Sequence, residues 1–337
     1  MSNILSRKNA LFNKNGPSVL TRVSKRIILR GRENRPELPP LFPVAYIRLP
    51  SRLRSFILSA AQSFTIEIIA SPQSTRTFRA ALFDFDGTLS LVREGWQNVM
   101  TPYFCEVLAE VADPARESAE DIERVVRDFV DKITGKQTIY QCIQLAEEVK
   151  ARGGTPLDPL LYKKEYLRRL QERIQNRIEK LESGAAKPDD FVVPGGRRFL
   201  QILRDAGIKL YLASGTDECY VKREAELLQL TPFFDGGIYG AQDDYKTFSK
   251  ALVIERLIKV NAIDGAELVG FGDGYVEIEN VRDVGGYAVG VATNEANPGA
   301  GVDAWKRGRL LNAGANAIVP DFSEPERLFA FLSGKDR

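Results

Sequence analysis

The chain of 337 residues contains no histidine, and this is its most informative absence. Without an imidazole, Ser-His-Asp triads, Cys-His dyads, phosphohistidine chemistry and histidine-ligated metal centres are all impossible. Catalysis by this chain must therefore use carboxylates, Lys, Ser, Thr, Tyr or Cys. A bound metal would have to be a hard cation that prefers oxygen ligands.

Cysteine is scarce too. The three cysteines, Cys105, Cys142 and Cys219, lie far apart and show no C-x-x-C spacing, so neither a disulfide framework nor a zinc site is indicated. We interpret them as small buried thiols in a reducing compartment and expect a cytoplasmic protein.

Long apolar runs are also absent. The nearest, residues 56–70, is broken by five polar side chains, which argues against a membrane span.

Acidic residues are missing from residues 1–32, which hold eight basic residues. Because the whole chain has a net charge of +2, the remainder carries the balance of −6, and no nucleic-acid-binding surface is expected there. Residues 1–63 are basic, contain Ser and Pro, and show no sustained period. Two interpretations stay open for them: a targeting peptide, or a tail that is disordered or non-native because of an upstream start codon.

The rest of the chain has a regular pattern. Residues 78–85 form a largely apolar run that predicts a buried strand, and residues 96–190 carry helical periods. After Pro194, apolar strands alternate with amphipathic helices, which predicts a parallel sheet covered on both faces. We therefore expect an α/β core over residues 64–95 and 191–337, interrupted by an all-helical insert over 96–190. The helices of that insert are predicted over residues 96–111, 119–133, 137–152 and 157–182.

The strongest chemical signal is the run Asp84-Phe85-Asp86-Gly87-Thr88 at the end of the first apolar strand. Alternate residues of a strand face the same way, so Asp84 and Asp86 can present two carboxylates at the sheet edge where open α/β sheets bind ligands. Such a pair suits one group that attacks or holds metal and another that moves a proton. A calcium loop is excluded because Leu89 and Gly95 occupy positions that need Gly and Glu. A plain surface turn remains an alternative.

Two further signals come later in the chain. Ser214-Gly215-Thr216 follows the strand predicted over residues 208–213 and precedes a helix, so a hydroxyl and free N–H groups can form an anion site there. An ordinary helix N-cap is the alternative. Lys250 lies near the start of a predicted helix, where a cation opposes the helix dipole. A solvated lysine is the alternative, and Lys246 is a nearby rival.

The last signal follows the strand predicted over residues 268–272. It is the run Gly272-Asp273-Gly274, with Glu277 four residues after Asp273. An acid at this position can complete an oxygen-rich magnesium site with Asp84. Read alone, the run is equally typical of a tight turn.

Together, in this order and along one sheet edge, the four signals resemble the haloacid dehalogenase superfamily, over residues 78–333. The resemblance is to phosphoglycolate phosphatase-like and phosphoserine phosphatase-like members. It implies an α/β fold, a Rossmann-like three-layer parallel sheet with an inserted helical cap. The family's first motif is matched without change at Asp84 to Thr88. Glu277 departs from the Asp that usually ends the fourth motif, which leaves open whether it contacts the metal directly.

The resemblance also implies roles. Asp84 would attack phosphorus, Asp86 would move the proton, and Mg²⁺ would be bound by Asp84, Asp86 through its backbone carbonyl, and Asp273, with Glu277 as a further candidate. The phosphoryl oxygens would be held by four residues: Thr88, Ser214, Gly215 and Lys250. Caps select substrate, and the candidates for substrate contact are Arg93, Lys136 and Gln137, with Trp96 at the hinge.

The favoured hypothesis is hydrolysis of a small phosphate monoester, such as phosphoglycolate or a sugar phosphate, with no nucleic-acid or membrane partner. A phosphomutase of the same fold is the first alternative. A binding or scaffold protein that kept the fold and lost turnover is the second. What speaks against the scaffold is the intact set of Asp84, Asp86, Ser214, Lys250 and Asp273. The oligomeric state is left open.

Overall fold

The structure is a computed structural model, and it describes residues 65–72, 77–242 and 244–335. Within these residues, seven strands form one sheet in the order β1-β7-β6-β5-β2-β3-β4. Neighbouring strands are parallel except at one edge, where β1 pairs antiparallel with β7. The strands are β1 (Glu67–Ile68), β2 (Ala80–Phe83), β3 (Lys209–Asp217), β4 (Ile238–Ala241), β5 (Leu268–Gly272), β6 (Tyr287–Val291) and β7 (Ala317–Val319).

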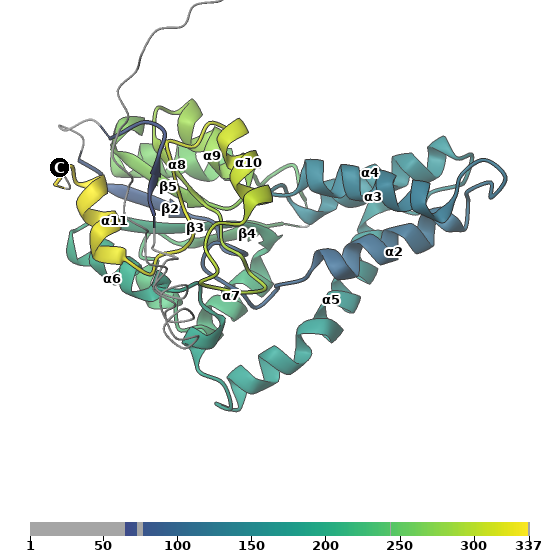
Figure 1. The fold of residues 1–337 in the computed structure, drawn as a ribbon, viewed down its shortest axis with the longest axis horizontal. Coiled ribbons are helices and arrows are strands. Elements are labelled where there is room, and N and C mark those ends of the chain that lie inside the picture. The colour runs from purple at the N-terminus through teal and green to yellow at the C-terminus, as the bar shows by residue number, and fades with distance from the viewer. Residues whose placement is uncertain (1–64, 73–76, 243, 336–337) are drawn as a thin grey trace, which may run out of the picture. The chain divides into compact units, whose positions relative to one another are not determined.

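Helices cover both faces of this sheet, as the continuous apolar strands predict. Every residue of β2, β5, β6 and β7 is buried, because parallel strands between two helical layers have no solvent-facing side. Figure 1 shows α8, α9 and α10 grouped on one face and α6, α7 and α11 on the other. The covering helices are α6 (Gly196–Asp205), α7 (Glu218–Leu227), α8 (Lys250–Asn261), α9 (Tyr275–Asp283), α10 (Ala304–Asn312) and α11 (Pro325–Leu332).

The core on the α6 side is aromatic. Phe83 of β2 stacks on Phe271 of β5 with ring centroids 4.6 Å apart, and Phe199 of α6 stacks on Phe322 at 5.1 Å. The four rings are fully buried. This packing fixes β2 and β5 as central neighbours, in the register Phe83 opposite Phe271. The loops that carry the motif carboxylates therefore start from adjacent points on the sheet.

A helical segment follows β2 and precedes the rest of the sheet. Its members are α2 (Gln97–Ala109), α3 (Ala119–Ile133), α4 (Thr138–Ala151) and α5 (Pro159–Glu182), all within two residues of the predicted bounds, and Figure 1 shows them projecting from one side of the sheet. Ser118 begins α3 with a capping box to Asp121, and Asp158 caps α5 ahead of a first-turn proline. Short 3-10 helices lie at Pro188–Phe191, Thr231–Phe233 and Gly265–Glu267.

The structure differs from the sequence prediction in two places on the chain after the helical segment. Helix α6 was not predicted. In addition, β3 continues to Asp217, so Ser214, Gly215 and Thr216 belong to the strand and do not form the N-terminus of α7. The register of β3 against β4 shifts between Ala213 and Asp217. Pairing with β4 resumes at Asp217, opposite Ala241, and the run of small polar residues in the sequence does not reveal this irregularity. Among the described residues, no helix is both long and apolar enough to cross a membrane.

Candidate active site

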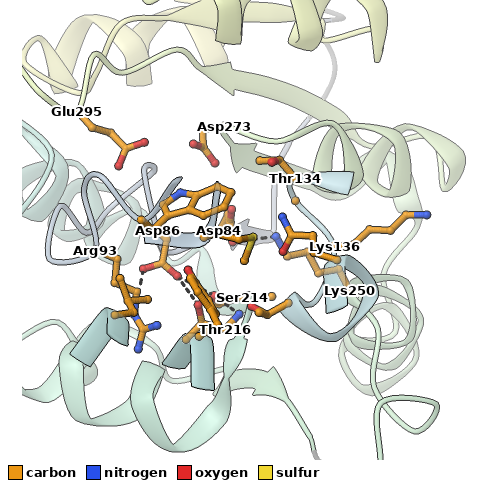
Figure 2. A pocket seen from close by; sticks show the side chains of 18 residues that line it. Asp84, Asp86, Arg93, Thr134, Lys136, Ser214, Thr216, Lys250, Asp273 and Glu295 are labelled. Carbon is orange, nitrogen blue, oxygen red and sulfur yellow. Dashed lines mark hydrogen bonds and ion pairs between the residues drawn. The ribbon is translucent and has the colours of Figure 1, made fainter. Parts of the chain in front are cut away.

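A small cavity of about 100 Å³ lies where β2, β3 and β5 end, beneath the helices that follow β2. Figure 2 shows predicted residues from four separate elements around it. The sheet side of the cavity is lined by Asp84, Asp86, Ser214, Gly215, Thr216, Lys250, Asp273 and Glu295. The four motifs, read separately in the sequence, therefore meet in one place.

Lys250 bridges two carboxylates at the base of the cavity. Its Nζ atom lies 2.8 Å from Oδ1 of Asp84 and 2.6 Å from Oε1 of Glu277. The residue is the first of α8, and all three side chains are buried. Burial alone would lower the pKa of Lys250, but the two carboxylates raise it overall, so the amine stays charged. Burial raises the pKa of Asp84, Glu277 adds to that rise, and Lys250 opposes it.

Asp86 is held from two sides. The hydroxyls of Ser214 and Thr216 donate to its Oδ2 atom, at 3.3 and 2.8 Å, and Nε of Arg93 lies 3.9 Å from its Oδ1 atom. Burial raises the pKa of Asp86, and Arg93 opposes the rise. A carboxyl group with a raised pKa is suited to donating a proton. The sequence analysis did not single out the Thr216 hydroxyl, although it stands two residues from Ser214 on the same strand face.

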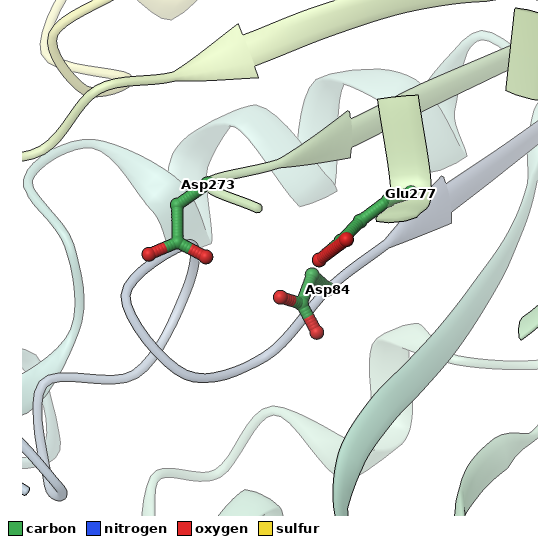
Figure 3. Close-up of side chains that lie close together, drawn as sticks. All are labelled: Asp84, Asp273 and Glu277. Atoms are coloured by element: carbon green, nitrogen blue, oxygen red, sulfur yellow. The ribbon is translucent and has the colours of Figure 1, made fainter. Parts of the chain in front are cut away.

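Two further acidic side chains, Asp273 and Glu277, lie close to Asp84. One carboxylate oxygen each from Asp84, Asp273 and Glu277 lies within 4.8 Å of the other two, as Figure 3 shows. Gly87 permits this approach, because a Cβ atom there would collide with Oδ2 of Asp273. Hard divalent cations favour such oxygen ligands. The side chain of Asp86 is not part of this cluster.

Lys306 and Glu295 are parts of the site that the sequence analysis missed. Nζ of Lys306 lies 2.7 Å from Oδ2 of Asp273 and 2.6 Å from Oε1 of Glu295. Burial alone would lower the pKa of Lys306, but its two partners raise it. Glu295 follows β6, the next strand along the same sheet edge, and Lys306 is on the helix after it. Its position just after a strand could therefore have identified Glu295 as a candidate site residue from the sequence.

The charges in and beside the cavity do not balance. Six carboxylates face three cations that are directed at them: Asp84, Asp86, Glu224, Asp273, Glu277 and Glu295 against Arg93, Lys250 and Lys306. With all six acids ionised, the site would carry an excess of three negative charges in buried surroundings, where isolated charge is costly, and burial accordingly raises the pKa values of Asp84, Asp86 and Asp273. A divalent cation beside Asp84 would reduce that excess, so these residues fit a metal site.

The predicted substrate contacts have three different surroundings. Arg93 is buried, and its guanidinium donates to Glu224 from Nε and from Nη2, the latter at 2.7 Å. Lys136 is among the residues that line the cavity, but in Figure 2 its ammonium end points away from the carboxylates. Gln137 does not line this cavity. Its amide donates to the backbone oxygens of Tyr245 and Phe248, at 3.1 and 2.8 Å, because its side chain faces the core segment before Lys250.

Thr88 also differs from its predicted place. Its side chain is fully buried, and its hydroxyl has no hydrogen-bond partner among the described residues. It is not among the residues that line the cavity. The rival lysine of the sequence analysis, Lys246, likewise lies outside the lining, whereas Lys250 reaches Asp84. Thr88 is therefore buried within the protein and does not face the cavity.

Comparisons with known proteins add the following. A family model described as haloacid dehalogenase-like hydrolase matches residues 78–285. No curated protein sequence matches the chain. Similar solved structures include a predicted phosphatase from Clostridium acetobutylicum, with 19% identity and a TM-score of 0.47 over 75% of this chain and 99% of that one. A β-phosphoglucomutase from Clostridium difficile has 15% identity and a TM-score of 0.46 over 77% and 98% of the two chains.

Proposed function

The chain belongs to the haloacid dehalogenase-like hydrolase family, and on that premise we propose that it hydrolyses a small phosphate monoester through an aspartyl-phosphate intermediate at Asp84. The observation that carries the proposal is the contact of Lys250 with Asp84 beside the cluster of Asp84, Asp273 and Glu277. Phosphoryl transfer needs positioning and neutralisation of charge more than covalent chemistry from the protein. A lysine and an acidic metal cluster at one carboxylate provide both without histidine.

In the first step, a carboxylate oxygen of Asp84 attacks phosphorus. A P–O bond forms to Asp84, and the P–O bond to the leaving group breaks. Asp86 gives its proton to the departing oxygen, so the product is an alcohol. The hydroxyl of Thr216, which donates to Asp86 at 2.8 Å in the structure, holds that carboxyl group in place.

In the second step, the same residues work in reverse. Asp86, now a carboxylate, takes a proton from a water molecule whose oxygen attacks phosphorus. The P–O bond to Asp84 breaks, inorganic phosphate leaves, and both aspartates return to their starting states. Lys250 and the hydroxyl of Ser214 lie on the cavity wall, and in this proposal they hold phosphoryl oxygens during both steps.

The metal in this proposal is Mg²⁺, held by Asp84 and Asp273, with the backbone carbonyl of Asp86 as a third donor and Glu277 nearby. When bound, it would supply positive charge that stabilises the phosphoryl oxygens. We further propose that residues 96–190 act as a cap that excludes water and selects the leaving group. The small cavity supports a small metabolite as substrate.

The test is release of phosphate from a panel of phosphorylated metabolites, with Mg²⁺ and with EDTA. We expect Mg²⁺-dependent release that the Asp84→Asn variant abolishes. The matched control is Asp128→Asn, an exposed aspartate of α3. Undiminished turnover by Asp84→Asn would refute the proposal. Appearance of an isomeric sugar phosphate in place of free phosphate would favour the phosphomutase alternative.

A further inference from the structure

The helices over the cavity present neutral polar groups to its leaving-group side. Gln141 of α4 and Tyr166 of α5 both line the cavity and are 4% and 3% exposed. No hydrogen bond joins either side chain to another described residue, and neither polar end is among the fully buried atoms without a partner, so both are accessible from the cavity that the residues line. Polar groups that face a cavity and pair with no protein group are free to hydrogen-bond a ligand there.

The same wall offers no free positive charge. The Arg93 guanidinium is engaged by Glu224, and the Lys136 ammonium is exposed and directed away. Lys163 of α5 pairs with Asp217 and lies outside the cavity lining. A second anionic group on a substrate would therefore meet no available cation among the described cap residues.

An acid of the cavity would repel such a group. Glu295 lines it from the sheet side, and like charges placed together at an interface cost several kcal/mol. The apolar part of the wall consists of Trp96, Met100 and Leu170, which suit contact with C–H groups. Burial also raises the pKa of Tyr166, so its hydroxyl stays neutral.

Resting on the proposed function, we propose that the leaving group is small, uncharged and rich in hydroxyls, as in a polyol or sugar phosphate. Gln141 and Tyr166 are then the residues that bind its hydroxyls. Phosphoglycolate, whose leaving group carries a carboxylate, is the wrong class. A site that hydrogen-bonds substrate hydroxyls discriminates strongly against analogues that lack them.

The experiment compares three phosphate esters with the full-length protein and Mg²⁺: glycerol 3-phosphate, 2-phosphoglycolate and phenyl phosphate. We expect kcat/KM for glycerol 3-phosphate to exceed that for phosphoglycolate by at least about tenfold, the equivalent of one charge contact. Turnover of phosphoglycolate as good as or better than that of glycerol 3-phosphate would overturn this inference alone. No release from any of the three would overturn the proposed function and this inference with it.

Two variants test the residues. We expect Gln141→Leu and Tyr166→Phe each to lower the ratio of kcat/KM for glycerol 3-phosphate to that for phenyl phosphate by about three- to tenfold, the effect of one neutral hydrogen bond. The matched control is Gln144→Leu on the same helix, where Gln144 donates to Glu148 outside the cavity. An unchanged ratio in both test variants, or an equal fall in the control, would overturn the inference.

Discussion

The ammonium of Lys306 lies 2.7 Å from Oδ2 of Asp273, a carboxylate of the candidate metal cluster. The same ammonium contacts Glu295 on its other side. Helix α10 thus contributes one positive charge that two acids share, at the edge of a cavity with excess negative charge. In the proposed phosphatase, this lysine is the internal counterion of a carboxylate that also has to face Mg²⁺.

Lys306→Met tests that relationship. The change leaves two buried carboxylates without their cation, and removing one partner of a buried ion pair typically costs about 3–5 kcal/mol. We expect a loss of that size in the free energy of unfolding measured with urea and EDTA. Because a divalent cation can replace part of the missing charge, Mg²⁺ should stabilise Lys306→Met more than the wild type.

The control for this variant is Lys222→Met, since Lys222 forms an exposed pair with Glu218. Surface pairs contribute about 0–1 kcal/mol, so this variant should unfold close to the wild type. Equal stabilisation of Lys306→Met and wild type by Mg²⁺ would contradict the role of Lys306 as a counterion in the metal site.

Gln137→Leu tests how the cap loop is attached. Gln137 donates to two backbone oxygens in the segment just before Lys250. Removing both bonds should cost about 1–3 kcal/mol, because the carbonyls lose their donor. We expect faster amide hydrogen exchange over residues 134–138. Gln175→Leu, on an exposed face of α5, is the matched control. Protection equal to the wild type in Gln137→Leu would show that the loop is held by other contacts.

The ion pair of Arg93 and Glu224 makes the stability of the folded protein depend on pH. Burial raises the pKa of Glu224 above its ordinary value of 4.5, and Arg93 opposes the rise without cancelling it. A carboxyl group with a raised pKa binds more protons in the folded protein than in the unfolded chain. Its contribution to stability is therefore complete below pH 4.5 and is lost as the pH rises through the folded-state pKa.

Glu224→Gln removes this titration. We expect the unfolding free energy of the wild type, relative to Glu224→Gln, to increase as the pH falls from 7 toward 4.5. Urea denaturation of both proteins at each pH measures that difference. A difference that stays constant, or that shrinks on acidification, would show that Glu224 does not titrate in this way.

Much of this arrangement follows from the sequence. The resemblance to the haloacid dehalogenase superfamily is confirmed by the family match, and the parallel sheet with an inserted helical segment was expected from its periods. Asp84 and Asp86 were placed together because alternate residues of a strand share a face. The strand ends of β3 and β5 then brought Ser214 and Asp273 to the same edge.

Other features depend on packing that the sequence does not encode locally. Lys306 reaches Asp273 only because α10 packs against the sheet in a particular register. Gln137 looked like a pocket residue because it stands in a polar loop, yet the cap is seated so that its amide meets the core backbone. Gln141 and Tyr166 lie within two predicted helices and were not proposed as site residues, since a periodic pattern cannot tell a cavity wall from a core.

The most direct test of the proposed function is to trap the covalent intermediate. The protein would be mixed with a turned-over phosphate ester and Mg²⁺, quenched, and treated with borohydride, which reduces an aspartyl phosphate to homoserine. Peptide mass spectrometry then locates the change. We expect homoserine at residue 84 and none in the same reaction with EDTA. Phosphate release without reduction at residue 84, or with reduction at another aspartate, would contradict it.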